Sequence, residues 1–203
     1  MRPIDIMRMR KAASGGTSLP LLRSYASGTS VTETAPTGAA NVVIEVWGGG
    51  GGGGHGSGTG CTGTTAFGGG SGAYSRASVA ITAGQTLAYT VGAAGLGSTV
   101  SSGTGSAGGA SSVVSGTKTI TTMTANGGVG GQELSGGTAA TASGGTAVNT
   151  SGNIDATNTA ATVYPPAGVN ANTGATPANG DGGAGKHGNG LDGTAGLVAF
   201  YYT

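Results

Sequence analysis

The chain is poor in charge, cysteine and histidine, and it has no long apolar run. Charged residues make up 7% of its 203 positions, against about 25% in ordinary soluble domains, which argues against the highly charged class of disordered chains. The single cysteine, Cys61, allows no disulfide within the chain. No apolar run approaches the roughly 18 residues that a membrane-spanning helix needs, so we expect no membrane insertion.

Residues for catalysis and for metal or cofactor binding are also scarce. His55 and His187 are the two histidines, and neither a CxxC pair nor a cluster of metal ligands accompanies them. Residues 103–108 match GxGxxG by letter, but a β pattern follows where a dinucleotide site needs a helix. Residues 180–186 approach a phosphate-binding loop, but His187 replaces the required Ser or Thr. We therefore expect no enzyme activity, no catalytic residue, no metal and no cofactor.

Glycine is the residue that the chain has in excess, with 47 among 203 positions, where about 7% is usual. Seven consecutive glycines follow a strand-like run at residues 41–47. Because glycine loses the most conformational entropy on folding, such a tract is ordered only if backbones pack and hydrogen-bond with one another. We expect polyglycine II helices, which are extended and threefold, packed against glycines near residues 127–131 or 180–190. The expected polyglycine core is Gly48, Gly49, Gly50, Gly51, Gly52, Gly53 and Gly54.

The rest of the body shows β patterns, and no segment shows a helical period. Val42, Ile44 and Val46 share one face of an expected strand. Two alternating runs flank a turn at residues 82–85, which predicts that they pair as a hairpin. The expected β segments are residues 24–34, 41–47, 73–81, 87–91, 111–114, 117–124 and 196–203, with 111–114 paired to 117–124.

A basic arm precedes a mildly acidic body. Through Arg23 the chain has five bases and one acid, and after it three bases and six acids. We expect an arm at residues 1–22 and a glycine-rich β domain at 23–203, with irregular glycine-helix regions mainly at 48–72 and 125–195. So short a segment cannot bury its apolar side chains alone and should order on a partner; no nucleic-acid recognition motif accompanies its bases. The candidate anchor residues are Arg2, Ile4, Ile6, Met7, Arg8, Met9, Arg10 and Lys11.

Several motifs follow one another in a fixed order. They are Ser27-Gly28-Thr29, Pro36-Thr37-Gly38, the strand at 41–47, the glycine tract, residues 68–74, Ala83-Gly84-Gln85-Thr86, residues 91–95, 108–112 and 124–128, and the closing strand that ends at Tyr202. This set, which spans residues 22–203, resembles the glycine-rich domain of bacteriophage tail-fibre and other virion proteins. The resemblance implies an all-β fold, a jelly-roll-like (tumour-necrosis-factor-like) sandwich with an inserted polyglycine II helix subdomain and an extended N-terminal arm.

The resemblance also implies a location and a role. We expect a non-enzymatic virion protein, a tail-fibre or spike tip that contacts the host surface, with a passive head, neck or tail decoration as the alternative. The arm would bind other virion proteins, the chain would form a homotrimer, and the host partner would be a surface glycan or an outer-membrane protein. The candidate receptor-contact loop contains Tyr164, Pro165, Pro166, Asn170 and Asn172. Ice binding is a distant alternative, because the chain has neither a strict Gly-x-x period nor disulfides.

Overall fold

The computed structural model describes residues 19–56, 68–100, 103–132, 147–149, 186–187 and 190–203. Within these residues the chain forms two antiparallel sheets and one short parallel pair, with no helix. The strands are β1 (Leu21–Tyr25), β2 (Val31–Thr34), β3 (Asn41–Trp47), β4 (His55–Gly56), β5 (Tyr74–Ala80), β6 (Thr86–Thr90), β7 (Ser111–Ser115), β8 (Met123–Ala125), β9 (Ala147–Asn149), β10 (Lys186–His187) and β11 (Leu197–Tyr202). The expected all-β class is therefore confirmed.

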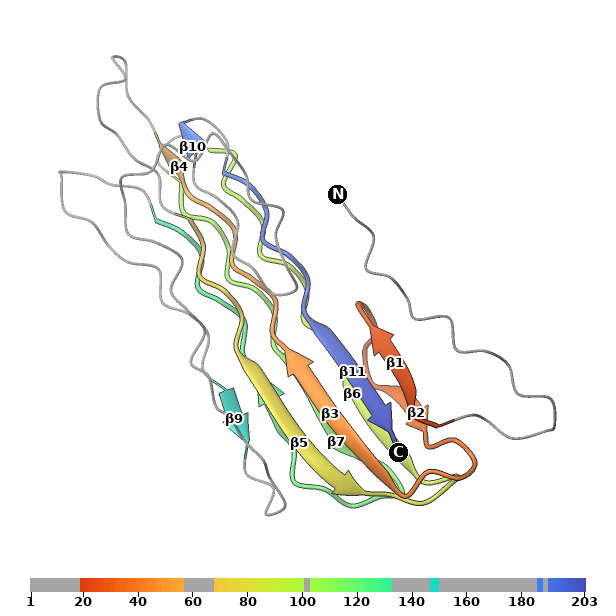
Figure 1. The fold of residues 1–203 in the computed structure, drawn as a ribbon. Helices are drawn as coiled ribbons and strands as arrows, with labels where there is room; N and C mark the ends of the chain where they lie inside the picture. The colour runs from red at the N-terminus through yellow and green to blue at the C-terminus, as the bar shows by residue number, and fades with distance from the viewer. Residues whose placement is uncertain (1–18, 57–67, 101–102, 133–146, 150–185, 188–189) are drawn as a thin grey trace.

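The two sheets face each other at one end of the molecule, and extended chain without strand pairing continues from them toward β4 and β10 at the other end (Figure 1). The first sheet has the order β1-β11-β3-β5 and the second β2-β6-β7-β8-β9. In the first sheet Phe200 of β11 lies opposite Ile44 of β3 and Arg23 of β1. The strand β1 begins at Leu21, within residues that the sequence assigns to the arm.

The core is the layer of side chains between the sheets, and alternation along the strands builds it. Val42, Ile44 and Val46 are fully buried, as are Phe200 and Tyr202. The second sheet contributes its own buried side chains, namely Leu87, Tyr89, Val113 and Met123. Each fully buried large aliphatic or aromatic side chain stabilises the fold by about 1.5–3 kcal/mol. The shared face expected for Val42, Ile44 and Val46 is therefore confirmed.

The prediction that residues 73–81 and 87–91 pair with each other as a hairpin is wrong. Both strands exist, but β5 pairs with β3 in the first sheet, whereas β6 pairs with β2 and β7 in the second. The turn between them, at residues 82–85, has Gly84 at φ +81°. It is tied to the end of β2, where Ala35 donates to the Gln85 carbonyl at 2.9 Å. Alternation identifies strands, but it does not say whether a turn returns within one sheet or crosses to the other.

The pairing expected between residues 111–114 and 117–124 is confirmed, with a shorter second strand. Strand β7 pairs antiparallel with β8, with Ser111 opposite Ala125. The second strand is shorter than its sequence pattern, because it begins only at Met123. The Ser115 hydroxyl donates to the carbonyl of Ile120 at 2.8 Å and accepts from its N–H at 2.9 Å. This side chain of β7 therefore holds the connection between β7 and β8, which is longer than expected.

Candidate functional site

The glycine tract at residues 48–54, here called the central tract, is buried along its whole length and is surrounded by extended backbone. Its N–H groups donate in a cycle of three, to residues 68–73, then 103–109, then 190–196. In all three cases the acceptor number falls as the tract number rises, so these neighbours run antiparallel to the tract. The donor and acceptor pairs, at 2.8–2.9 Å, are Gly48 and Ala73, Gly49 and Gly109, Gly50 and Thr194, Gly51 and Gly70, Gly52 and Ser106, and Gly53 and Leu191.

The carbonyl groups of the central tract bind a different set of neighbours. Residues 91–98 and 126–132 both run parallel to the tract and donate to it at intervals of three. The pairs, at 2.8–2.9 Å, are Gly95 and Gly50, Ser98 and Gly53, Gly128 and Gly49, and Gly131 and Gly52. Antiparallel and parallel neighbours therefore alternate around the tract. Hydrogen bonds between backbones hold this part of the molecule together.

The neighbours also bind one another, which makes the arrangement continuous. Residues 126–132 accept from both 68–73 and 103–109, and residues 91–98 accept from both 103–109 and 190–196. Side chains would interrupt these contacts. A Cβ atom on Gly51 would overlap the Val129 carbonyl oxygen, and one on Gly52 would overlap that of Leu96. The packing expected of the tract against residues 127–131 is thus observed, and so is the ordering of the tract.

The segments of this bundle extend away from the sheets toward one end of the molecule (Figure 1). The chain leaves the described residues there after Gly56, Val100 and Gln132, and it re-enters at Gly68 and Gly103. We call this the distal end. Near it the side chains of Leu96 and Val100 are 64% and 65% exposed.

The distal end also brings the two histidine-bearing strands together. The parallel pair of β4 and β10 sets Lys186 beside His55 and His187 beside Gly56. The Nδ1 atom of His55 is buried and has no hydrogen-bond partner among the residues that the structure describes. Among the described residues no group of three or more His, Cys, Asp or Glu side chains could hold a metal ion. The same part of the chain contains no helix long and apolar enough to cross a membrane.

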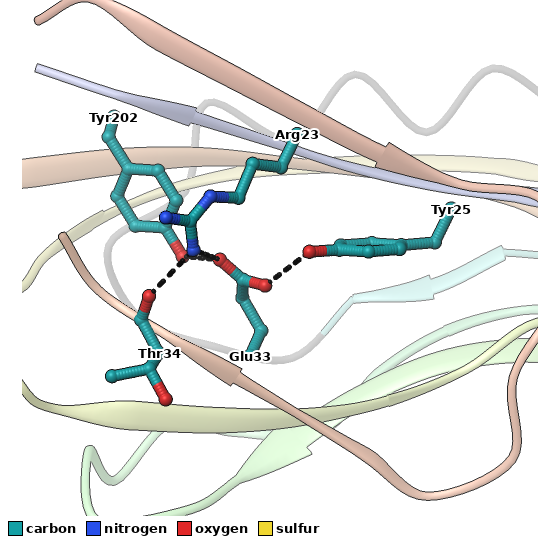
Figure 2. A network of polar contacts seen from close by, with 5 residues as sticks. All are labelled: Arg23, Tyr25, Glu33, Thr34 and Tyr202. Atoms are coloured by element: carbon teal, nitrogen blue, oxygen red, sulfur yellow. Dashed lines mark hydrogen bonds and ion pairs between the residues drawn. The ribbon is translucent and has the colours of Figure 1, made fainter. Parts of the chain in front are cut away.

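A second polar arrangement lies between the sheets at the opposite end and is centred on Glu33, which is only 3% exposed (Figure 2). Its Oε1 atom accepts from Arg23 Nη1 at 2.7 Å and from Tyr202 Oη at 2.8 Å. Its Oε2 atom accepts from Tyr25 Oη at 2.6 Å. The carboxylate of β2 in one sheet therefore binds β1 and β11 of the other. We call these four residues the Glu33 network.

The sequence patterns do not predict the Glu33 network. A charged residue between two threonines reads as the solvent face of a strand, yet Glu33 points inward and Thr32 and Thr34 point outward. Two sequence features together could have indicated this network. Acids are rare in the body of the chain, and the run 21–25 carries an arginine and a tyrosine at alternate positions. Three donors from the other sheet bind both oxygens of the carboxylate, so the network joins the sheets.

We expect stability to fall as the pH rises above 10. Burial, and then the hydrogen bond to Glu33, raise the pKa of Tyr25 to about 12 and raise the pKa of Tyr202 further. In the unfolded chain both phenols ionise near pH 10. Between these values the unfolded state binds fewer protons than the folded state, so the free energy of unfolding decreases with pH. Urea unfolding at pH 8, 10 and 11 measures this. Tyr25→Phe should flatten the pH dependence, and equal stability at all three values would contradict it.

The structure describes some of the site residues predicted from the sequence but not others. It describes the central tract and brings it together with five other segments. Residues 103–108, which match a nucleotide motif by letter, belong to one of those segments, and their Gly105 and Gly108 pack on the carbonyls of Gly52 and Gly49. The candidate anchor residues between Arg2 and Lys11 and the candidate contact loop around Tyr164–Asn172 lie outside the described residues.

Comparison with known proteins identifies the family to which the chain belongs. No curated protein matches the chain. A protein-family profile described as "Glycine-rich domain" matches residues 25–203, which include β2 to β11 and the whole central tract. The match begins at the last residue of β1 and covers well over half of the chain. The chain therefore belongs to the glycine-rich domain family.

Proposed function

We propose that the central tract and its five neighbours are polyglycine II helices, and that the two sheets form a jelly-roll-like sandwich beneath them. Polyglycine II has three residues per turn and no hydrogen bonds within a helix. The three-residue cycle in which the central tract changes partners is the observation that supports this assignment. The absence of side chains in the tract allows helices to approach on every side.

We further propose that the protein is a non-enzymatic bacteriophage virion component, a tail-fibre or spike tip. Family membership and the ordered sequence motifs support this role. The polarity of the molecule supports it too. Leu21, where β1 begins, pairs with Tyr202 at the end of β11, whereas Tyr25 pairs with Val198, on the side where β11 continues from the bundle. The chain therefore enters the domain at the end opposite the distal end.

This polarity suits a molecule attached at one end and active at the other. In this proposal, residues 1–18 bind other virion proteins, and the distal end, with its exposed Leu96 and Val100, contacts a glycan or protein of the host surface. A homotrimer is proposed on the resemblance to phage fibres. The rigid bundle between the two ends holds the contact surface away from the particle.

Deletion of residues 1–18 is expected to abolish incorporation into virions and to leave a folded domain. The deletion removes four of the chain's basic residues but no described strand. It stops before Leu19, because that side chain packs against the core. Immunoblotting of purified particles measures incorporation, and circular dichroism with thermal melting of the purified protein verifies folding.

The matched control is Val100→Ser, which changes an exposed side chain at the distal end and should incorporate normally. Electron microscopy of gold-labelled particles should place the full-length protein at the end of a fibre or spike. Normal incorporation of the deletion protein would overturn the role of the arm. Labelling spread over the head would favour a passive decoration.

A further inference from the structure

The outer face of the first sheet, which points away from the core, carries a group of aromatic and charged side chains. They come from β5, β3 and β11, which lie side by side (Figure 1). Because the intervening residues of each strand are buried, alternation turns these side chains outward. In register, Trp47 lies opposite Tyr74 and Glu45 lies opposite Arg76, while Tyr201 lies on β11, on the other side of β3. We call these five residues the aromatic platform.

Every aromatic side chain that the structure describes belongs either to the core or to this platform. Those in the core or packed against it are Tyr25, Tyr89, Phe200 and Tyr202. The outer face of the second sheet differs, since the outward positions of β6 and β7 carry only threonine, serine, alanine and valine. In a chain with 4% aromatic and 7% charged residues, the aromatic side chains outside the core are thus gathered on one sheet, beside an ion pair.

Glu45 holds the side chains of the platform in place from its centre. Its Oε1 atom accepts from Tyr74 Oη at 2.8 Å, and Arg76 Nε lies 3.4 Å from the same atom. Burial, and then the nearby charge of Glu45, raise the pKa of Tyr201 on the neighbouring strand, so its phenol stays protonated at neutral pH. The ring of Tyr74 contacts that of Trp47, with centroids 5.0 Å apart and planes tilted by 44°. A ligand would therefore meet side chains that are already ordered, which lowers the entropic cost of binding.

The chemistry of the platform matches that of a neutral sugar ring. Such a ring has an apolar face of C–H groups, which packs on the electron-rich face of an aromatic ring, and hydroxyls around its edge. Trp47 and Tyr74 are partly exposed and supply the aromatic surface. The side chains of Glu45 and Arg76 are 18% and 40% exposed, and they supply an acceptor and a donor for hydroxyls. Because their charges are opposite, the platform favours a neutral saccharide over a charged one.

The size of the platform favours a small ligand over a protein. It extends across three strands, which lie about 4.8 Å apart, and along two steps of about 6.8 Å between successive outward residues of one strand. Its area is therefore roughly 10 by 14 Å, or about 140 Å². A stable protein interface buries about 800 Å² on each partner. The platform is far smaller than that and suits a short saccharide.

We infer that the aromatic platform binds a neutral saccharide, whose ring stacks on Trp47 and Tyr74 and whose hydroxyls bind Glu45 and Arg76. The site lies on the sheets and is separate from the distal end, for which a contact with the host surface is proposed above. The inference goes beyond the role in the virion and does not depend on it.

The test uses the full chain and the fluorescence of Trp47, which is the only tryptophan. An array of neutral oligosaccharides built from glucose, galactose, mannose and their N-acetylated amino sugars selects the strongest binder. Titration with that oligosaccharide in solution should change the emission of Trp47 saturably. Arg76→Met keeps the reporter and should weaken binding about tenfold, since it removes a charged donor. Trp47→Leu should abolish binding on the array. The control is Thr124→Ala, on the outer face of the second sheet, which should bind as the unaltered protein does.

Circular dichroism verifies that each variant folds, and Arg76→Met carries the test if Trp47→Leu does not fold. The absence of saturable binding to every oligosaccharide of the array would overturn the inference. Binding that Arg76→Met leaves unchanged, or that does not alter the emission of Trp47, would also overturn it, because the sugar would then lie elsewhere. Sedimentation that shows self-association, lost in Trp47→Leu, would instead assign the platform to a contact between copies. None of these results bears on incorporation into virions, which the deletion of residues 1–18 tests separately.

Discussion

Gly51→Val is expected to lower the free energy of unfolding by about 3–5 kcal/mol, at the upper end of what overpacking costs. The new Cβ would overlap the carbonyl oxygen of Val129 and approach that of Gly128. Both atoms belong to backbone that is itself hydrogen-bonded to residues 68–73 and 103–109. No side chain rotation relieves the overlap, so whole segments must move apart. Denaturant unfolding followed by circular dichroism measures the loss.

The control for this prediction is Ala93→Val, an enlargement on the exposed side of a neighbouring extended segment. It should change the free energy of unfolding by about 0.5 kcal/mol or less. If Gly51→Val and Ala93→Val behave alike, the tract is not packed as described. Gly51→Ala should lie between them but closer to valine, because the first added carbon already overlaps backbone.

Glu33→Ala is expected to cost about 3 kcal/mol, because it removes the acceptor of three donors at once. Tyr202 is fully buried, and its hydroxyl would lose its partner without access to water. The side chain of Arg23 is 35% exposed and can turn to solvent, so its share of the loss is small. Thermal and urea unfolding of the purified variants measure the change.

Two further variants separate charge from hydrogen bonding. Arg23→Met should cost about 1 kcal/mol or less, since a partly exposed ion pair contributes little. Glu33→Gln keeps the size of the side chain and one acceptor oxygen, and its cost should be intermediate. An Arg23→Met variant as unstable as Glu33→Ala would show that the ion pair, and not the tyrosine hydroxyls, holds the sheets together.

The strands and their inward faces were predictable because alternation is a local property. Val42, Ile44 and Val46 alternate with Val43, Glu45 and Trp47, and the structure buries all three. The partners of a strand are not local. Nothing in residues 73–91 distinguishes a hairpin from a crossing between sheets, and the tie from Ala35 to Gln85 that marks the crossing joins residues fifty positions apart.

The glycine tract was predictable in its ordering but not in its partners. The entropy argument requires some backbone to pack on it. Which backbone does so depends on three-dimensional register, and glycine-rich stretches resemble one another in sequence. Residues 103–108 illustrate the difficulty, since their spacing matches a nucleotide motif while Gly105 and Gly108 approach the carbonyls of Gly52 and Gly49. The Glu33 network escaped prediction because pattern rules place carboxylates outside.

The alternating directions of the segments around the central tract have a mechanical consequence. A pull on the distal end along the long axis would try to slide each segment past its neighbours, so their hydrogen bonds would be loaded in shear. Bonds loaded in shear share the force and must break together, whereas those of a peeled strand break one after another. Because the residues of the tract are together bonded to five segments, the load is distributed across the cross-section before it reaches the sheets.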